Sequence, residues 1–338
     1  MPINWNRTAL AGGLVALLAV PAAVIVARGD DAGPADPAAS PRSASAPAER
    51  AEVAAADLPA LAFAANDGAG FRIAAVAPDG TGRVEVTAGR GMYPAWSPDG
   101  TELAYVGEHA AVTGTQLAVR VVAGDGEVRT VTTGTQVPSN LAFRSAGELY
   151  YEASLQATSG AAGISSTTSI DRVSTAGGNQ RTAVYERGAT YHPAWSPDGT
   201  RLAYAVAPGA CEGARCGQPL VVRTGERSVR VVDHGVAANP SWSPDGTRIA
   251  FAWKPGTGTG AGRLGIWTVV PGRAPVRVTD GRADDEPTWS PDGDRIAFTR
   301  DCDVWVQDVA AGSGPARNVT ATPGTCEISP TWRPEGAR

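Results

Sequence analysis

The stretch HPAWSPDGTRLAY runs from His192 to Tyr204 and occurs three more times with small changes. The other copies are YPAWSPDGTELAY at 93–105, NPSWSPDGTRIAF at 239–251 and EPTWSPDGDRIAF at 286–298. Trp195, Trp242 and Trp289 follow one another at intervals of 47 residues. A fixed period of this length indicates a protein built from repeated supersecondary units.

Two weaker copies complete the series. NLAFRSAGELYYEA at 140–153 places Phe143 where a tryptophan is expected, 47 residues after Trp96, and SPTWRPEGAR at 329–338 ends the chain. The motif therefore occupies six positions, whose aromatic residues are Trp96, Phe143, Trp195, Trp242, Trp289 and Trp332.

Each repeat predicts four short strands. Ser-Pro-Asp-Gly after the tryptophan is a turn sequence, because proline presets one torsion, aspartate accepts backbone hydrogen bonds and glycine adopts the strained position. Strands such as RLAY at 201–204, LGIWTVV at 264–270 and PVRVTDG at 275–281 follow in their units. Four strands per period of this length are typical of a β-propeller blade.

The two ends of the repeat region predict how the ring closes. LAFAAN at 61–66 matches the second strand of a unit, whereas the last copy is a first strand with no continuation. The C-terminal strand therefore completes the first blade, which leaves no open blade edge at the junction. We predict an all-β, six-bladed propeller of four-stranded blades over residues 58–338, with the motif aromatics packed between blades.

The copies of PAWSPDGTRLAY resemble the WD40-like repeat of the TolB propeller family over about residues 61–338. The resemblance implies a six-bladed, extracytoplasmic propeller that binds partners at one end of its channel. The protein that gives the family its name carries a folded α/β domain before its propeller, where this chain has an apolar segment and a linker. The resemblance therefore implies a partner-binding propeller, without the role of that protein in its own assembly.

The N-terminal region differs from the repeats. Residues 8–27 form a run of twenty residues without a charge, and a helix of that length spans roughly 30 Å, the apolar thickness of a bilayer. We expect residues 1–28 to be a signal anchor, a membrane helix at 8–27, or alternatively a cleaved signal peptide. Residues 29–57 are rich in Ala, Pro and Ser and are predicted to be a linker. Both interpretations place the propeller outside the cytoplasm, either single-pass anchored or secreted.

The residue three positions before each motif aromatic varies from blade to blade. We expect these residues to begin the innermost strands and to form a polar binding ring at one channel mouth. The alternative is that these residues only contact water in the channel mouth and bind no partner. The ring residues are Tyr93, Asn140, His192, Asn239, Glu286 and Ser329.

Cysteines and acidic residues supply two further predictions. We expect disulfides between Cys211 and Cys216 and between Cys302 and Cys326, in keeping with export. The acidic residues around the sixth blade form a patch that could bind calcium or a basic tail, or only be solvated. The patch residues, beside Glu286, are Asp284, Asp285, Asp301 and Asp303.

The function predicted is a non-enzymatic module that binds an envelope protein or peptide as a monomer and without a cofactor. Nucleic acid is excluded as a partner, because the net charge is −5 and no basic block is present. One alternative is an extracytoplasmic enzyme, such as a metal-assisted polysaccharide lyase or hydrolase, with acid–base groups among Tyr93, His192, Asp285 and Glu286. Another is a ligand-sensing domain.

Overall fold

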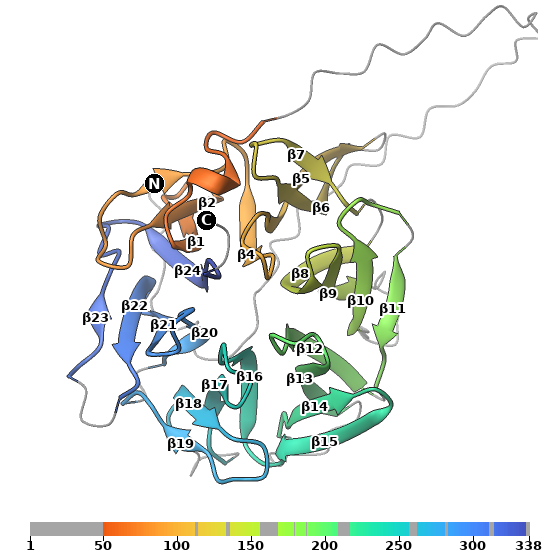
Figure 1. Cartoon of the computed structure of the whole chain (residues 1–338), viewed down its shortest axis with the longest axis vertical. Coiled ribbons are helices and arrows are strands. Elements are labelled where there is room, and N and C mark those ends of the chain that lie inside the picture. The colour runs from red at the N-terminus through yellow and green to blue at the C-terminus, as the bar shows by residue number, and fades with distance from the viewer. Residues whose placement is uncertain are drawn as a thin grey trace, which may run out of the picture. The chain divides into compact units, whose positions relative to one another are not determined.

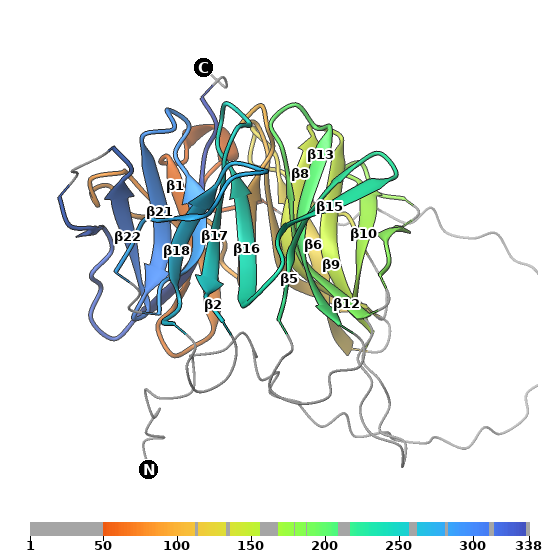
Figure 2. The same cartoon turned by 90° about the horizontal axis from the view of Figure 1, so that it is seen from below.

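The computed structural model of the chain describes residues 50–111, 114–132, 136–155, 168–178, 180–186, 188–208, 217–256, 262–280, 283–310 and 314–335. The strands in these ranges form six antiparallel sheets of four strands each, which radiate from one axis (Figure 1). Seen from the side, the strands run between the two faces of the propeller (Figure 2). The predicted six-bladed all-β fold is therefore confirmed.

The strands of the first three blades follow one another from the innermost to the outermost. Blade 1 contains β24 (Cys326–Trp332), β1 (Leu61–Asn66), β2 (Phe71–Val76) and β3 (Val84–Glu85). Blade 2 contains β4 (Gly91–Trp96), β5 (Leu103–Ala111), β6 (Gly114–Val122) and β7 (Val128–Thr130). Blade 3 contains β8 (Gln136–Ser145), β9 (Glu148–Leu155), β10 (Thr168–Ser174) and β11 (Arg181–Val184).

The other three blades repeat this order. Blade 4 contains β12 (Gly188–Trp195), β13 (Arg201–Pro208), β14 (Leu220–Thr224) and β15 (Arg227–Val232). Blade 5 contains β16 (Val236–Trp242), β17 (Ile249–Lys254), β18 (Gly265–Val269) and β19 (Val276–Arg277). Blade 6 contains β20 (Asp285–Trp289), β21 (Arg295–Arg300), β22 (Asp303–Asp308) and β23 (Arg317–Asn318).

Blade 1 closes the ring as the sequence predicted. The C-terminal strand β24 pairs with β1 in antiparallel register, from Leu61 opposite Trp332 to Asn66 opposite Cys326. The innermost strand of the first blade thus comes from the other end of the chain. Because the two ends of the repeat region share one sheet, the ring cannot open at this point without breaking strand pairing.

The repeated turn shows why the motif keeps its letters. In blade 4, Ser196 Oγ donates to Asp198 Oδ1 at 2.5 Å, and Thr200 N donates to the same oxygen at 3.1 Å. The hydrogen bond from Ser196 is the main cause that lowers the pKa of Asp198 to about 2. Gly199 adopts φ +64°, a left-handed conformation that suits glycine. The aspartate of the motif is therefore a turn residue.

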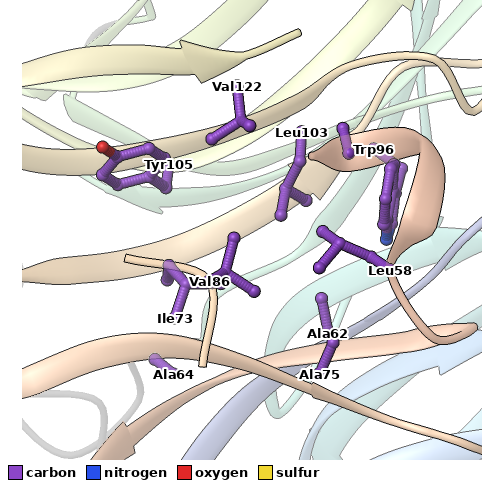
Figure 3. Packing of buried hydrophobic residues seen from close by; sticks show 11 residues of the cluster. Leu58, Ala62, Ala64, Ile73, Ala75, Val86, Trp96, Leu103, Tyr105 and Val122 are labelled. Carbon is purple, nitrogen blue, oxygen red and sulfur yellow. The ribbon is translucent and has the colours of Figure 1, made fainter. Parts of the chain in front are cut away.

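The hydrophobic core is divided among the junctions between blades. Each of the six junctions holds one cluster of apolar side chains with one motif aromatic in it, as the sequence predicted. Figure 3 shows the junction of blades 1 and 2, where Trp96 of β4 packs with Leu58, Ala62 and Leu103. The apolar wedge between blades is thus supplied by the repeated residue.

Each motif tryptophan is also covered by an arginine from the preceding blade. Arg201 Cζ lies 4.5 Å from the ring centroid of Trp242, and Arg248 Cζ lies 4.7 Å from that of Trp289. Such contacts are attractive because the cation faces the negative side of the aromatic ring. The other pairs are Arg333 with Trp96, Arg144 with Trp195 and Arg295 with Trp332.

Residues 50–57, which precede β1, pack on the propeller, although their composition predicted a linker. A short 3-10 helix, η1 (Ala55–Asp57), follows residue 54, and Ala55 is fully buried. Arg333 Nη1 donates to Ala56 O at 2.8 Å, which ties this segment to the C-terminal end of the chain. Residues 50–57, which we expected to belong to the linker, therefore contribute to the junction of blades 1 and 2.

The expected membrane helix at 8–27 and the linker up to residue 49 lie outside the described residues. Within the described residues, no helix has the length and apolar character needed to cross a bilayer.

Candidate functional site

The six variable residues share one backbone conformation. Each has a left-handed φ, and in each blade the register between the first and second strands shifts at this point. The φ values are +52° for Tyr93, +47° for Asn140, +54° for His192, +49° for Asn239, +53° for Glu286 and +54° for Ser329. These residues therefore form six equivalent β-bulges.

The bulges lie inside the innermost strands and not at their first residues, contrary to our expectation. The residue before each bulge still pairs with the second strand, as Met92 does with Val106 and Asp285 does with Thr299. Taken as whole residues, all six are half-buried. The predicted ring is thus set within the strands rather than at their starts.

A proline follows the bulge residue in five of the six blades. Pro94, Pro193, Pro240, Pro287 and Pro330 are all buried. Proline has no N–H for the strand ladder and is tolerated in a sheet at a bulge. It also disfavours the right-handed helical conformation in the preceding residue. A left-handed non-glycine residue costs about 1–3 kcal/mol, and here the surrounding sheet holds it in place.

Glu286 joins blade 6 to the closing strand. Its Oε2 accepts from Ser329 N at 2.7 Å and from Thr299 Oγ1 at 2.8 Å, and its Oε1 accepts from Ser329 Oγ at 2.7 Å. Burial, and secondly the charge of Asp285, raise the pKa of Glu286. Two of the predicted ring residues are therefore in direct contact.

Two further carboxylates link Asn140 to His192 and Asn239 to Glu286. Glu152 of β9 accepts from Asn140 Nδ2 at 2.8 Å and from His192 N at 3.4 Å. Asp285 Oδ1 accepts from Asn239 Nδ2 and from Glu286 N, both at 2.8 Å. We call the six ring residues together with Glu152 and Asp285 the axial belt.

Glu152 was not predicted from the sequence. It belongs to the second strand of the divergent repeat, and no feature of the motif marks it. Its side chain is largely buried, with 8% of the residue exposed. Only the pairing of β9 with β8, and the packing of blade 3 beside β12 of blade 4, bring it between Asn140 and His192.

Tyr93 and His192 complete the belt. Burial raises the pKa of Tyr93, and the negative charges of Glu286 and Glu152 raise it further, so Tyr93 stays a neutral phenol. His192 Nδ1 is buried and has no hydrogen-bond partner among the described residues. The belt thus combines three carboxylates with a phenol, an imidazole and amide groups, which suits hydrogen bonding to donors on a ligand.

The acidic residues that were predicted to form one patch contact different partners. Asp284 is buried and accepts from Arg300 Nε at 2.6 Å and Arg300 Nη2 at 2.8 Å. Asp303 accepts from Asn318 Nδ2 at 2.8 Å, and Asp301 is exposed. Within the described ranges, no three acidic, histidine or cysteine side chains gather as metal ligands.

One of the two expected disulfides lies in the described part of the chain. Cys302, in the turn between β21 and β22, is bonded to Cys326, the first residue of β24. Glu327 N also donates to Cys302 O at 2.8 Å. The pair therefore fastens the closing strand to blade 6, while Cys211 and Cys216 lie outside the described residues.

Comparison with solved structures shows the same architecture. TolB from Acinetobacter baumannii matches with a TM-score of 0.61 and 15% identity, over 82% of this chain and 67% of that one. A putative TolB from Agrobacterium tumefaciens gives 0.54 and 18%, over 81% of this chain and 99% of that one. Hydrazine synthase from Kuenenia stuttgartiensis gives 0.63 and 12%, over 84% and 48%. At these identities the likeness shows the fold alone.

Sequence comparison identifies the family. No curated protein matches the chain. The family model of the TolB beta propeller domain matches residues 158–338. Since this match covers more than half of the 338 residues, the chain belongs to the TolB β-propeller family.

Proposed function

We propose that this chain is a non-enzymatic binding module of the cell envelope, which holds a protein or peptide partner at its axial belt. The observation that carries the proposal is the contrast within the repeat. Tryptophan, turn and proline recur, whereas the bulge residue changes from blade to blade. A rigid scaffold that presents different side chains at equivalent positions is suited to recognition.

The chemistry of the belt favours a ligand rich in hydrogen-bond donors. Glu152, Asp285 and Glu286 supply carboxylate oxygens, and Tyr93 and His192 supply flat rings beside them. An extended peptide offers backbone N–H groups and side-chain donors at regular intervals. We therefore propose a peptide segment, either free or projecting from a folded envelope protein, as the bound element.

The proposed location is extracytoplasmic, with the chain acting as a monomer anchored through residues 8–27 or secreted after cleavage. Support comes from the apolar N-terminal run and from the disulfide between Cys302 and Cys326, since disulfides persist in oxidising compartments. The family to which the chain belongs agrees with an envelope role.

Photo-crosslinking in cells tests the binding proposal. A photoreactive phenylalanine analogue replaces Tyr93 in the belt or, as a matched control, Tyr185, which is 65% exposed on the outer side of blade 3. We expect a discrete protein adduct from position 93 and none from position 185. The same adducts from both positions, or none from position 93 in a correctly folded protein, would contradict the proposal.

A second candidate is an extracytoplasmic enzyme acting on a polysaccharide. It is favoured by Glu286, a buried carboxyl group with a raised pKa, because such groups serve as general acids. The test is release of oligosaccharides from acidic polysaccharides, with and without calcium or manganese, by the wild type and by Glu286→Gln. Activity in the wild type that is lost in Glu286→Gln would replace the binding proposal.

A further inference from the structure

The carboxyl groups of the axial belt have no cation beside them. Among the described residues, Glu152, Asp285 and Glu286 accept hydrogen bonds only from amide, hydroxyl and backbone N–H groups. The ion pairs of the described ranges include none of the three. The belt therefore gathers acidic groups whose charge the described chain does not neutralise.

Buried carboxylates outside the belt make a different set of contacts. Among the described residues there are three, and two of them are paired with an arginine. Arg300 Nε donates to Asp284 Oδ1 at 2.6 Å, and Arg83 contacts Glu327. The third, Asp171, accepts from a serine hydroxyl and belongs to β10, the third strand of its blade. Because a buried carboxylate without a cation costs stability, three acidic groups at one site indicate a cation that comes from outside the chain.

Carboxyl groups from opposite sides of the ring act on the same phenol. Glu152 belongs to blade 3 and Glu286 to blade 6, and these blades face each other across the axis (Figure 1). Burial is the main cause that raises the pKa of Tyr93, and the negative charges of Glu286 and Glu152 raise it further. The fields of the two carboxyl groups therefore overlap within the belt.

The belt also contains acceptor atoms without a partner among the described residues. Only 8% of Glu152 is exposed, and both of its hydrogen bonds are made by Oε2, so Oε1 accepts none. Asp285 likewise uses Oδ1 for both of its contacts. His192 Nδ1 is buried and unpartnered, and it is an acceptor when the imidazole carries its proton on Nε2. These atoms suit a ligand with several N–H donors.

We propose that the axial belt binds a positively charged group, the guanidinium of an arginine or the ammonium of a lysine, on an extended segment of the partner. The inference rests on the proposed function, since it names the group that the bound peptide places in the belt. Hydrogen bonds between a cation and a carboxylate are roughly twice as strong as those between neutral groups. The partner thus supplies the countercharge that Arg300 supplies to Asp284 within the chain.

The test is calorimetric titration of the detergent-solubilised full chain with three acetylated pentapeptide amides. Arginine, lysine or citrulline stands at the centre of each peptide between pairs of glycines. Citrulline has nearly the shape of arginine but carries no charge. We expect saturable binding of a cationic peptide and an affinity at least about tenfold lower for the citrulline peptide. No saturable binding of either cationic peptide up to about 10 mM, or the same affinity for the citrulline peptide, overturns the inference.

Two matched variants test whether the belt is the site. Glu152→Gln/Asp285→Asn removes two acidic groups and keeps their size and an oxygen that can accept the same hydrogen bonds. Glu127→Gln/Glu226→Gln removes the same charge from two exposed positions. We expect affinity for the cationic peptide to fall at least about tenfold in the first variant and to be unchanged in the second. Equal affinity in the two variants overturns the inference, and the comparison of peptides on the wild type needs neither variant to fold.

Crosslinking from position 93 distinguishes failure of this inference from failure of the proposed function. A protein captured equally well by the wild type and by Glu152→Gln/Asp285→Asn overturns the cationic group alone and leaves the binding module in place. Cationic peptide binding without any adduct from position 93 supports the cationic group and contradicts the envelope partner.

Discussion

At the scale of the residue, the tryptophans and arginines of the motif act as one unit. Trp242 lies at the junction of blades 4 and 5, and its Nε1 donates to Ala194 O at 3.2 Å in the preceding blade. Arg201 covers the ring and also donates to Gly246 O at 2.9 Å across the same junction. The tryptophan ring packed between the blades and the arginine over it therefore both connect neighbouring blades.

We expect Trp242→Ala to lower the free energy of unfolding by about 3–5 kcal/mol, because it removes a large buried ring and leaves a cavity. Trp242 is only 6% exposed, so contact with solvent offsets little of this loss in stability. Trp242→Phe keeps most of the apolar area and should lose much less. Urea unfolding followed by circular dichroism measures both, and equal losses in the two variants would contradict the wedge interpretation.

The buried carboxyl of Glu286 predicts a pH effect. Its pKa is raised above the ordinary 4.5, mainly by burial, so the folded state holds this proton more tightly than the unfolded state. The stability that the group contributes is therefore complete below its unfolded pKa and is lost as the pH rises through its folded pKa.

Relative to Glu286→Gln, the wild type should thus lose stability as the pH rises from about 4 toward neutrality. Urea unfolding of both proteins at a series of pH values measures the difference. A difference that stays constant over this range would show that Glu286 ionises in the folded protein as it does in the unfolded chain.

At the scale of the element, the sequence predicted the strands and turns whose residues are neighbours in the chain and recur in each repeat. Trp195, the Ser-Pro-Asp-Gly turn and the strand after it are neighbours in the chain, so their pattern was sufficient to place the blades and the closing strand. Residues 50–57 have no such pattern, because the burial of Ala55 depends on side chains from strands of blades 1 and 2. Composition alone therefore assigned them to a linker.

The candidate site could be predicted only in part for the same reason. The position of the six ring residues followed from the repeat, but their left-handed bulges did not, although the proline after five of them was a usable signal. Glu152 joins the belt because β9 pairs with β8 and lies beside β12 of the next blade, an arrangement that tertiary folding makes. No local sequence pattern carries that information.

In the six described sheets, the outermost strands each have one edge without a partner strand, and such an edge can pair with another chain. They are short, from two to six residues, and each carries at least one charged residue. Charge on a short edge strand disfavours pairing with other chains. The charged residues are Glu85, Arg129, Arg181, Arg227, Arg230, Arg277 and Arg317.

The disulfide at β24 should stabilise the closing strand measurably. Cys302 and Cys326 are 24 residues apart, and closing a loop of that length removes chain entropy worth about 3.5 kcal/mol from the unfolded state. We expect Cys302→Ser/Cys326→Ser to unfold at lower denaturant concentration than the oxidised wild type. Under reducing conditions the two proteins should nearly coincide, and a gap that persists after reduction would contradict the crosslink as the cause.

At the scale of the whole molecule, β24 connects blade 1 to blade 6. It pairs with β1, is crosslinked to blade 6 through Cys326, and accepts the guanidinium of Arg83 on Glu327. Ser329 N and Oγ donate to the carboxyl group of Glu286, and Trp332 fills the junction between blades 6 and 1. Loss of this one strand would expose the edge of β1 and the apolar residues behind it.

A chain that ends at Gly324 should therefore self-associate more than the full chain, and a synthetic peptide of residues 325–338 should reverse this by taking the place of β24. The reason is that most contacts of β24 are non-covalent and are made to parts of the ring that fold from residues 50–324. In the peptide, Trp332→Ala removes the wedge at the last junction and should weaken rescue at least about tenfold. Size-exclusion chromatography of the truncated chain with increasing peptide measures this. Equal rescue by both peptides would mean that strand pairing alone closes the ring. A truncated chain that stays monomeric without peptide would mean that the other five complete blades hold the ring together without closure.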